Sequence, residues 1–322
     1  DDSMKHFLVR GFAILAFLDA ASVGLWAQTK LRIAAIPMGT THVFWKSVEA
    51  GAKRAGEEFW AEIIWKGPIK ENDRAQQISI VEQFINEGVS GIALAPLDHA
   101  ALRRPVNSAR QKRIPVVIFD SPLDGEAGRD FVSFVGTNNK QGGIVGGMHL
   151  SKLLEGKGKV ILLRYAVGAA SSMAREDGFL EAISNAKDII VTVKNRYAGA
   201  TAGEAKTVSM NLLDKLKQAN GIFCPNESTT FGMLLALRQS NLAGKKKFVG
   251  FDTSPPLLEA LKNGEIDALV AQDPTRIGFE AVKAVVSHIK GEKVNVRIDT
   301  GVQLITRENL SDPKIKALLG TP

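Results

Sequence analysis

The feature that most constrains the fold is a repeated alternation of short β-branched runs with longer amphipathic stretches, beginning near Leu31. This alternation is typical of β-α units built around a parallel sheet. Gly88, after the second amphipathic stretch, is suited to the left-handed end of a helix. In the first half we expect strands at 31–36, 62–65, 91–95 and 116–119, and helices at 43–59, 75–87 and 100–112.

The same pattern starts again in the second half of the chain, after a joining segment at 131–137. A length of 322 residues suits two α/β lobes of ordinary size. The sequence therefore predicts two doubly wound parallel-sheet lobes. Strands are expected at 160–163, 189–193, 221–224, 247–251 and 268–271, and helices at 141–154, 173–184, 201–217, 229–239 and 257–262.

The N-terminal segment has the features of a secretory signal peptide. Basic residues Lys5 and Arg10 precede an apolar run at 11–18, and a small-residue tail ends at Ala27. The apolar run is too short to span a bilayer. We expect residues 1–27 to be removed by cleavage near Ala27 and the mature chain to be periplasmic, without a lipid-bearing cysteine near its start.

Composition excludes several classes of function. The 41 basic and 34 acidic side chains give a formal net charge of +7, but the basic residues are dispersed, so we expect no nucleic-acid partner. Cys224 is the single cysteine, and the five histidines lack metal-ligand spacing, so neither a metal nor a cofactor is expected. The glycines of 142–147 lie within a predicted helix and favour close helix packing over a phosphate loop.

Polar and aromatic residues follow the predicted strands, where open α/β sheets bind their ligands. Their side chains combine carboxylates, amides, a guanidinium and flat rings, which suit a small polyhydroxylated ligand. The alternatives are core packing for the aromatic pair, helix capping for the two aspartates and a surface ion pair for the arginine. The strand-end candidates are Phe44, Trp45, Asp120, Arg175, Asn226, Asp252 and Gln272.

Six short fragments occur in the order and spacing of one family. Residues 31–305 resemble the type I periplasmic binding proteins of the ribose-binding family, the soluble receptors of sugar ABC importers. The fragments are Thr-Thr-His-x-Phe-Trp, Val-x-x-Phe-Asp, Val-Gly-Thr-Asn-Asn, Ala-Arg-x-x-Gly-Phe, Val-Gly-Phe-Asp and Ala-Gln-Asp-Pro.

The resemblance implies a three-crossing hinge near Thr137, Gln272 and Thr300. One lobe would then comprise 28–137 plus 273–300, and the other 138–272 plus 301–322. It also implies ring stacking by Phe44 and Trp45, a polar contact from His42, a contact from Thr137 at the first crossing, and hydroxyl binding by the remaining strand-end candidates. The implied protein is a monomer that binds a sugar or polyol, closes, and serves a membrane permease or a chemoreceptor.

Ala95, Ser121 and Ala200 depart from the pattern of ribose receptors, and a different pentose, a hexose or a linear polyol is equally consistent with the sequence. Two other classes of protein are alternatives. A hydrolase could use Ser171, His149 and Asp120, but the sequence has no nucleophile-elbow motif. A lactose-repressor-type regulator would need a DNA-binding headpiece of about 60 residues before the first strand, where this chain has 30.

Overall fold

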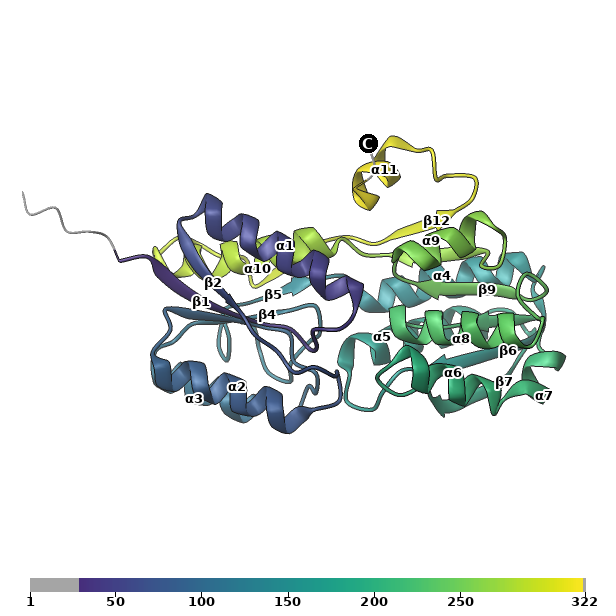
Figure 1. The fold of residues 1–322 in the computed structure, drawn as a ribbon, viewed down its shortest axis with the longest axis horizontal. Coiled ribbons are helices and arrows are strands. Elements are labelled where there is room, and N and C mark those ends of the chain that lie inside the picture. The colour runs from purple at the N-terminus through teal and green to yellow at the C-terminus, as the bar shows by residue number, and fades with distance from the viewer. Residues whose placement is uncertain (1–28, 321–322) are drawn as a thin grey trace, which may run out of the picture.

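A computed structural model describes residues 29–320 and contains two lobes side by side along the long axis of the molecule (Figure 1). Each lobe is a six-stranded sheet with helices on both faces. The structure thus confirms the predicted class of two doubly wound α/β lobes. The predicted signal peptide, residues 1–27, lies outside the described residues.

The sheet of the first lobe is parallel throughout. One face is covered by α1 and α10, which lie beside each other in Figure 1 although they are far apart in sequence, and the other by α2 and α3. The strands, in spatial order, are β2 (Ala61–Trp65), β1 (Leu31–Ile36), β3 (Gly91–Leu94), β4 (Val116–Phe119), β5 (Ser133–Gly136) and β11 (Arg297–Asp299). The helices are α1 (Val43–Glu58), α2 (Arg74–Glu87), α3 (Arg103–Gln111) and α10 (Pro274–Ile289).

The second lobe repeats this arrangement strand for strand, except that its last edge strand is antiparallel. Helices α4 and α5 cover one face and the remaining helices the other. The strands, in spatial order, are β7 (Asp188–Tyr197), β6 (Lys157–Arg164), β8 (Gly221–Phe223), β9 (Lys247–Phe251), β10 (Ala268–Ala271) and β12 (Gln303–Thr306). The helices are α4 (Asn139–Leu153), α5 (Ala170–Ser184), α6 (Ala202–Met210), α7 (Leu213–Gln218), α8 (Glu227–Gln239), α9 (Pro255–Lys262) and α11 (Pro313–Leu319).

The chain passes between the two sheets three times: between β5 and α4, between β10 and α10, and between β11 and β12. The first and third passages lie side by side, because the Thr300 N–H donates to the Gly136 carbonyl at 3.1 Å. Parallel strands point their carboxyl ends in one direction. These passages therefore bring the loops after the strands of both lobes to the boundary between them.

Glycines allow the covering helices to approach one another closely. A Cβ on Gly143 of α4 would lie 1.9 Å from the Arg175 carbonyl oxygen of α5, and one on Gly178 would lie 2.1 Å from the Lys140 carbonyl oxygen. The glycines of 142–147 therefore serve helix packing, as the sequence predicts. The left-handed helix end predicted at Gly88 is also confirmed, with φ of 65°.

Three features of the secondary structure differ from the sequence prediction. The segment 131–137, predicted as a joining segment, contains strand β5, whose four residues are all buried. The helix predicted at 201–217 is two helices, α6 and α7, separated at residues 211–212. No regular elements were predicted for α10, β11, β12 and α11.

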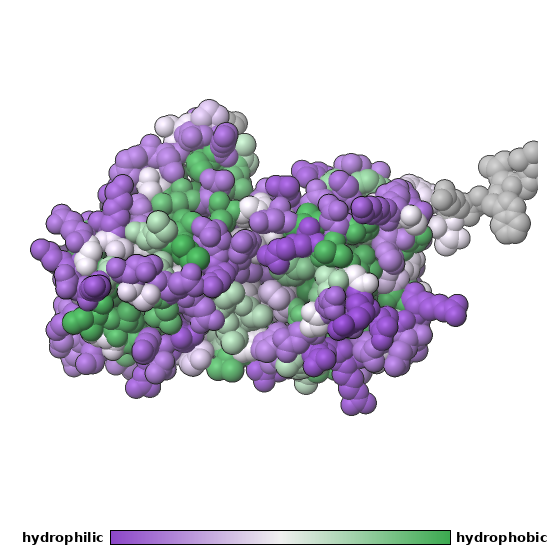
Figure 2. All heavy atoms as spheres, turned by 180° about the vertical axis from the view of Figure 1, so that it is seen from behind, coloured by the Kyte–Doolittle hydropathy of each residue, from purple (hydrophilic) through white to green (hydrophobic). Residues whose placement is uncertain are grey.

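None of the helices within residues 29–320 has both the length and the apolar character needed to cross a membrane. Figure 2 shows hydrophilic residues over most of both lobes on the face it displays, with hydrophobic residues confined to smaller areas.

Candidate functional site

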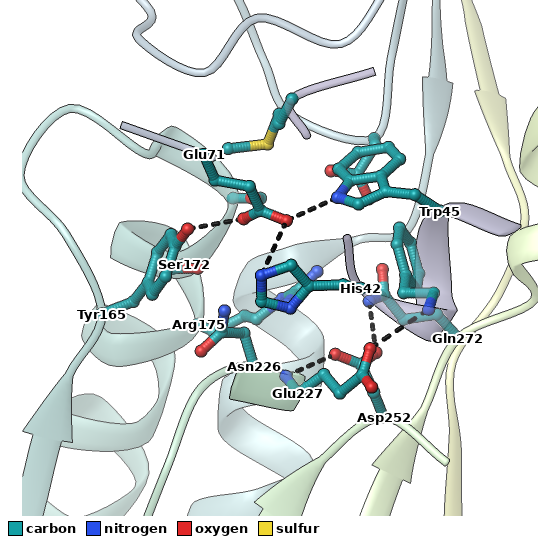
Figure 3. A pocket seen from close by; sticks show the side chains of 14 residues that line it. His42, Trp45, Glu71, Tyr165, Ser172, Arg175, Asn226, Glu227, Asp252 and Gln272 are labelled. Carbon is teal, nitrogen blue, oxygen red and sulfur yellow. Dashed lines mark hydrogen bonds and ion pairs between the residues drawn. The ribbon is translucent and has the colours of Figure 1, made fainter. Parts of the chain in front are cut away.

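A cavity lies at the boundary between the lobes. Its walls combine side chains from strand ends and helix starts of both lobes. Figure 3 shows them pointing toward a common centre. The first lobe contributes Met38, His42, Phe44, Trp45, Glu71 and Asp120. The second contributes Tyr165, Ser171, Ser172, Arg175, Asn226, Glu227, Asp252 and Gln272.

Two aspartates occupy equivalent places in the two sheets. Asp120 follows β4 with φ of 59°, and Asp252 follows β9 with φ of 69°. Each backbone N–H still donates to the neighbouring strand, to Val135 at 2.8 Å and to Val270 at 2.9 Å. Aspartate adopts left-handed backbone conformations more readily than most residues. This turn ends the strand and leaves each buried carboxyl group lining the cavity.

The two carboxyl groups differ in their partners. Asp252 accepts hydrogen bonds from the Glu227 N–H at 2.9 Å and from Gln272 Nε2 at 2.7 Å. It thus meets the first N–H of α8 and does not cap α9, the helix that follows it in sequence. Asp120 Oδ1 is buried and has no hydrogen-bond partner within the described chain, and the same holds for Gln272 Oε1.

Arg175 extends from α5 with only 3% of its surface exposed. Its guanidinium donates from Nε to Asn139 at 2.8 Å and from Nη1 to the Pro225 carbonyl at 2.9 Å. It also stacks over the Phe251 ring at 4.3 Å. Its hydrogen-bond partners are therefore neutral, and in residues 29–320 no carboxylate forms an ion pair with it within 4.0 Å.

The aromatic pair stands in the first turn of α1. Trp45 is buried, lies edge-on to Phe44 and Phe119, and donates its indole N–H to Glu71 Oε1 at 2.5 Å. Phe44 is half-buried, and its backbone N–H donates across the lobe boundary to Glu227 Oε2 at 3.1 Å. Both rings line the cavity while also packing on the core, so core packing is observed and stacking on a ligand stays a prediction.

Glu71 accepts hydrogen bonds from residues of both lobes. Its carboxylate accepts the Tyr165 O–H at 2.5 Å as well as the Trp45 indole N–H, and His42 Nε2 lies 3.8 Å away. Tyr165 follows β6 in the second lobe, and Glu71 lies in the loop before α2 in the first. This hydrogen bond can therefore form only when the lobes are together.

Further contacts join the rims of the cavity. The Ser171 N–H donates to the Ser121 hydroxyl at 3.3 Å, and the His99 N–H donates to the Gly168 carbonyl at 3.1 Å. Gly168 has φ of 89°, and a Cβ there would lie 2.5 Å from Asp98 Oδ2 of the other lobe. The lobes are closed in this structure, because backbone and side chains meet directly across the boundary.

Burial sets the protonation of several cavity groups. Burial raises the pKa of Asp120 to about 7; the Arg175 guanidinium opposes this shift, while the carboxylates of Asp252 and Glu71 add to it. The pKa of Asp252 is raised by the same cause and opposed by Arg175. Burial also raises the pKa of Glu227, to which the Asp252 carboxylate adds. The closed cavity is therefore costly for negative charge.

Eight of the nine residues predicted for the site line this cavity, and the exception is Thr137. Thr137 is fully buried at the first passage between the sheets, and its hydroxyl has no partner among the described residues. Asn226 lines the cavity, but its side-chain oxygen accepts the Thr229 N–H at 3.3 Å as the cap of α8.

The hydrolase triad weighed from the sequence does not come together, because His149, its base, does not line the cavity. The charged neighbours of His149 are Lys152, Asp267 and Glu308. Within residues 29–320 no three His, Cys, Asp or Glu side chains are grouped so as to hold a metal ion.

Sequence reasoning missed Tyr165, Glu71 and Glu227. The signal for Tyr165 was available, since it directly follows strand β6, and Glu227 directly follows the predicted Asn226. Glu71 lies six residues beyond the end of β2, so no strand-end rule indicates it.

Two sheets whose loops enclose one small polar cavity define a two-lobed receptor that closes on a small ligand. The periplasmic binding protein domain family matches residues 33–293, most of the chain. The chain belongs to this family of periplasmic binding proteins.

Individual relatives agree with the family match. The chain is 31% identical over 264 residues to the ribose import binding protein RbsB of Bacillus subtilis, with 82% of each chain covered. It is 32% identical to a carbohydrate transporter solute binding protein from Agrobacterium radiobacter, solved with D-arabinose, with a TM-score of 0.86 and coverage of 90% and 99%. It is 33% identical to an ABC transporter solute binding protein from Agrobacterium vitis, solved with D-fucose, with a TM-score of 0.85 and coverage of 88% and 98%.

Proposed function

We propose that this chain captures a monosaccharide or a polyol in the cavity between its lobes and presents it to the permease of an ABC importer. The observation that carries the proposal is the convergence of aromatic rings, a buried guanidinium and strand-end carboxylates on one cavity. Aromatic faces cover the C–H face of a sugar, while carboxylates and the guanidinium bind its hydroxyl groups. Solved relatives that hold D-arabinose and D-fucose support a ligand of this class.

The two lobes contribute different residues to the cavity wall. His42, Phe44, Trp45 and Asp120 belong to the first lobe, whereas Arg175, Asn226, Asp252 and Gln272 belong to the second. A ligand held by both walls stabilises the closed form, because only that form lets it make both sets of contacts. Tyr165 adds to this by donating to Glu71 across the boundary, so part of the closing free energy comes from the protein itself.

We also propose where the protein works, which partners it has and which parts of the chain move when the lobes close. The predicted signal peptide and the family support a periplasmic protein that works as a monomer with a membrane permease and, as a second partner, a chemoreceptor. The bodies that move on closure are 28–137 plus 273–300, and 138–272 plus 301–322. We place the hinge at the three passages between the sheets, with Thr137 acting there and not in the cavity wall.

A thermal-unfolding screen of the mature chain against pentoses, hexoses and polyols tests the proposal. A ligand at 100 times its dissociation constant stabilises the folded state by about 2.7 kcal/mol. For a protein of this size that corresponds to a shift of roughly 4 °C. If no sugar or polyol shifts the unfolding temperature, the proposed class of ligand is wrong.

Substituting Arg175 tests the location of the site. Arg175→Ala should abolish binding of the best ligand from the screen, since it deletes the one guanidinium that lines the cavity. Arg129→Ala is the matched control, because Arg129 is an exposed arginine paired only with nearby acidic residues of its own loop. Undiminished affinity in a folded Arg175→Ala protein would contradict the proposed site.

A further inference from the structure

The cavity wall carries an excess of acidic groups. Among residues 29–320, four carboxyl groups line it, whereas the only basic side chains there are one guanidinium and one imidazole. The chain as a whole is basic, with 41 Lys and Arg against 34 Asp and Glu, so the acidic wall does not follow from overall composition. The acidic residues are Glu71, Asp120, Glu227 and Asp252, and the basic ones are His42 and Arg175.

Hydrogen bonds hold three of these four carboxyl groups as acceptors. Glu71 accepts from the Trp45 indole and the Tyr165 hydroxyl, and Asp252 accepts from a backbone N–H and from the Gln272 amide. Glu227 accepts the Phe44 backbone N–H. The ionised form of each carboxyl group can accept these hydrogen bonds, while burial raises the pKa of Asp252 and Glu227 and so makes their negative charge costly.

The basic groups do not balance these charges. The hydrogen bonds of Arg175 go to an amide oxygen and a backbone carbonyl, and His42 lies beside Glu71 at 3.8 Å. Even a fully charged imidazole leaves the wall with more carboxylates than cations. Excess buried charge of one sign is costly, so a cation within reach of these carboxyl groups would stabilise their ionised form.

A second observation shows where that counter-charge belongs. Asp120 is 4% exposed and Gln272 is 3% exposed; both residues line the cavity, and each has one buried side-chain oxygen without a donor in the described chain. An ammonium group supplies up to three donors and no acceptor, whereas a hydroxyl group supplies a single donor. Acceptors without donors next to excess negative charge match an ammonium group.

We propose that the ligand carries a protonated amine, as an amino sugar or an amino polyol does, and that the ammonium group binds against Asp120. The inference rests on the proposed function, because it concerns the ligand of the same cavity. The carboxylates are too dispersed to chelate a metal ion, since no three of the described ligating side chains form such a group. The counter-charge is therefore part of an organic ligand.

Isothermal titration with matched trios tests the proposal. Each trio contains a neutral sugar, its 2-amino-2-deoxy derivative and the N-acetylated amine: the glucose, galactose and mannose series. D-Glucitol with 1-amino-1-deoxy-D-glucitol adds a polyol pair. We expect at least one amine to bind ten or more times more tightly than both its neutral parent and its N-acetyl derivative, because acetylation removes the charge while keeping the nitrogen.

Asp120→Asn then removes one charge while keeping the shape of the wall. We expect the preference for the amine over its neutral parent to fall by at least tenfold in Asp120→Asn. Asp177→Asn is the matched control, because Asp177 is an exposed residue of α5 outside the cavity. If Asp120→Asn does not fold, the wild-type protein still serves: the preference should disappear as the pH rises past the pKa of the amine itself.

The outcomes separate this inference from the proposed function. If neutral sugars bind and amines bind no more tightly, the charged ligand is wrong while the proposed function holds. If neither these compounds nor any sugar or polyol of the thermal-unfolding screen binds, both are wrong. Stabilisation by Ca²⁺ or Mg²⁺ alone would overturn the inference by showing that a metal supplies the counter-charge.

Discussion

Tyr165→Phe is the most informative single substitution for the closing of the lobes. The change removes one oxygen atom and with it the hydrogen bond from Tyr165 to Glu71, at 2.5 Å, that crosses the boundary. The ring stays, so the packing of this buried side chain is kept. Because the two partners belong to different lobes, the loss should destabilise the closed form and leave each separate lobe unchanged.

The size of the effect follows from the partners. A hydrogen bond to a charged group contributes about 1.5–3 kcal/mol to stability. A factor of ten in an equilibrium constant corresponds to about 1.36 kcal/mol. The dissociation constant of the ligand should therefore rise roughly 10- to 150-fold in Tyr165→Phe, while the unfolding temperature without ligand stays close to that of the wild type.

Titration calorimetry with the best ligand measures the change, and Tyr197→Phe is the matched control. Tyr197 is the only other tyrosine of the chain and lies exposed at the end of β7. A double-mutant cycle with Glu71→Ala isolates the pair, since the two substitutions should be strongly non-additive. Affinity within twofold of wild type in Tyr165→Phe, or full additivity in the cycle, would refute the proposed contribution of this hydrogen bond to closure.

Three further predictions concern closure, helix packing and pH. Gly168→Ala should weaken ligand binding by roughly five- to 150-fold in titration calorimetry, because overpacking costs about 1–3 kcal/mol and the new methyl group meets the other lobe only on closure. Gly156→Ala is the control, because Gly156 has a similar backbone strain but open space around it. An equal loss of affinity in Gly156→Ala would contradict the prediction. Gly143→Ala should lower the free energy of unfolding by about 1–3 kcal/mol in urea titrations. Gly203→Ala, at a helix glycine with open space around it, should be neutral or stabilising by up to about 1 kcal/mol. Equal effects of the two substitutions would argue against the close crossing of α4 and α5. Lowering the pH from 8 to 6 should increase the closed fraction of the ligand-free protein in small-angle X-ray scattering. Burial in the closed form raises the pKa of the Asp120 carboxyl group to about 7, so this group becomes neutral over that range. Asp120→Asn should abolish the response, and an unchanged response in this variant would disprove the link between Asp120 protonation and closure.

The strand-end part of the site could be predicted because parallel sheets gather their carboxyl ends. Asp120 and Asp252 each end a continuous apolar run, so the sequence alone indicates that their side chains leave the sheet at its ligand-binding edge. The fold class followed from the alternation of strands and helices for the same reason. The edge strands after the second passage lacked this regularity, since β11 has three residues and β12 pairs antiparallel at an edge. Helix α10 was missed although its buried apolar residues recur at helical spacing.

The residues that sequence reasoning missed depend on how the lobes meet. Glu71 reaches the cavity from a loop, and its role arises from Tyr165, which lies 94 residues away in the chain and in the other lobe. No local pattern encodes such a contact, because it exists only after the three passages bring the sheets together. The position of Thr137 at a passage between the sheets was predicted, but its side chain is buried there and does not line the cavity.

A crystal structure of the mature chain grown with the best ligand from the sugar and amine panels would show whether the interlobe cavity is the binding site. We expect ligand density between the Phe44 and Trp45 rings and the Arg175 guanidinium, with a donor of the ligand at hydrogen-bonding distance from Asp120 Oδ1. Density elsewhere, such as the groove lined by Val43, Pro255 and Leu318, with the interlobe cavity unchanged, would contradict it.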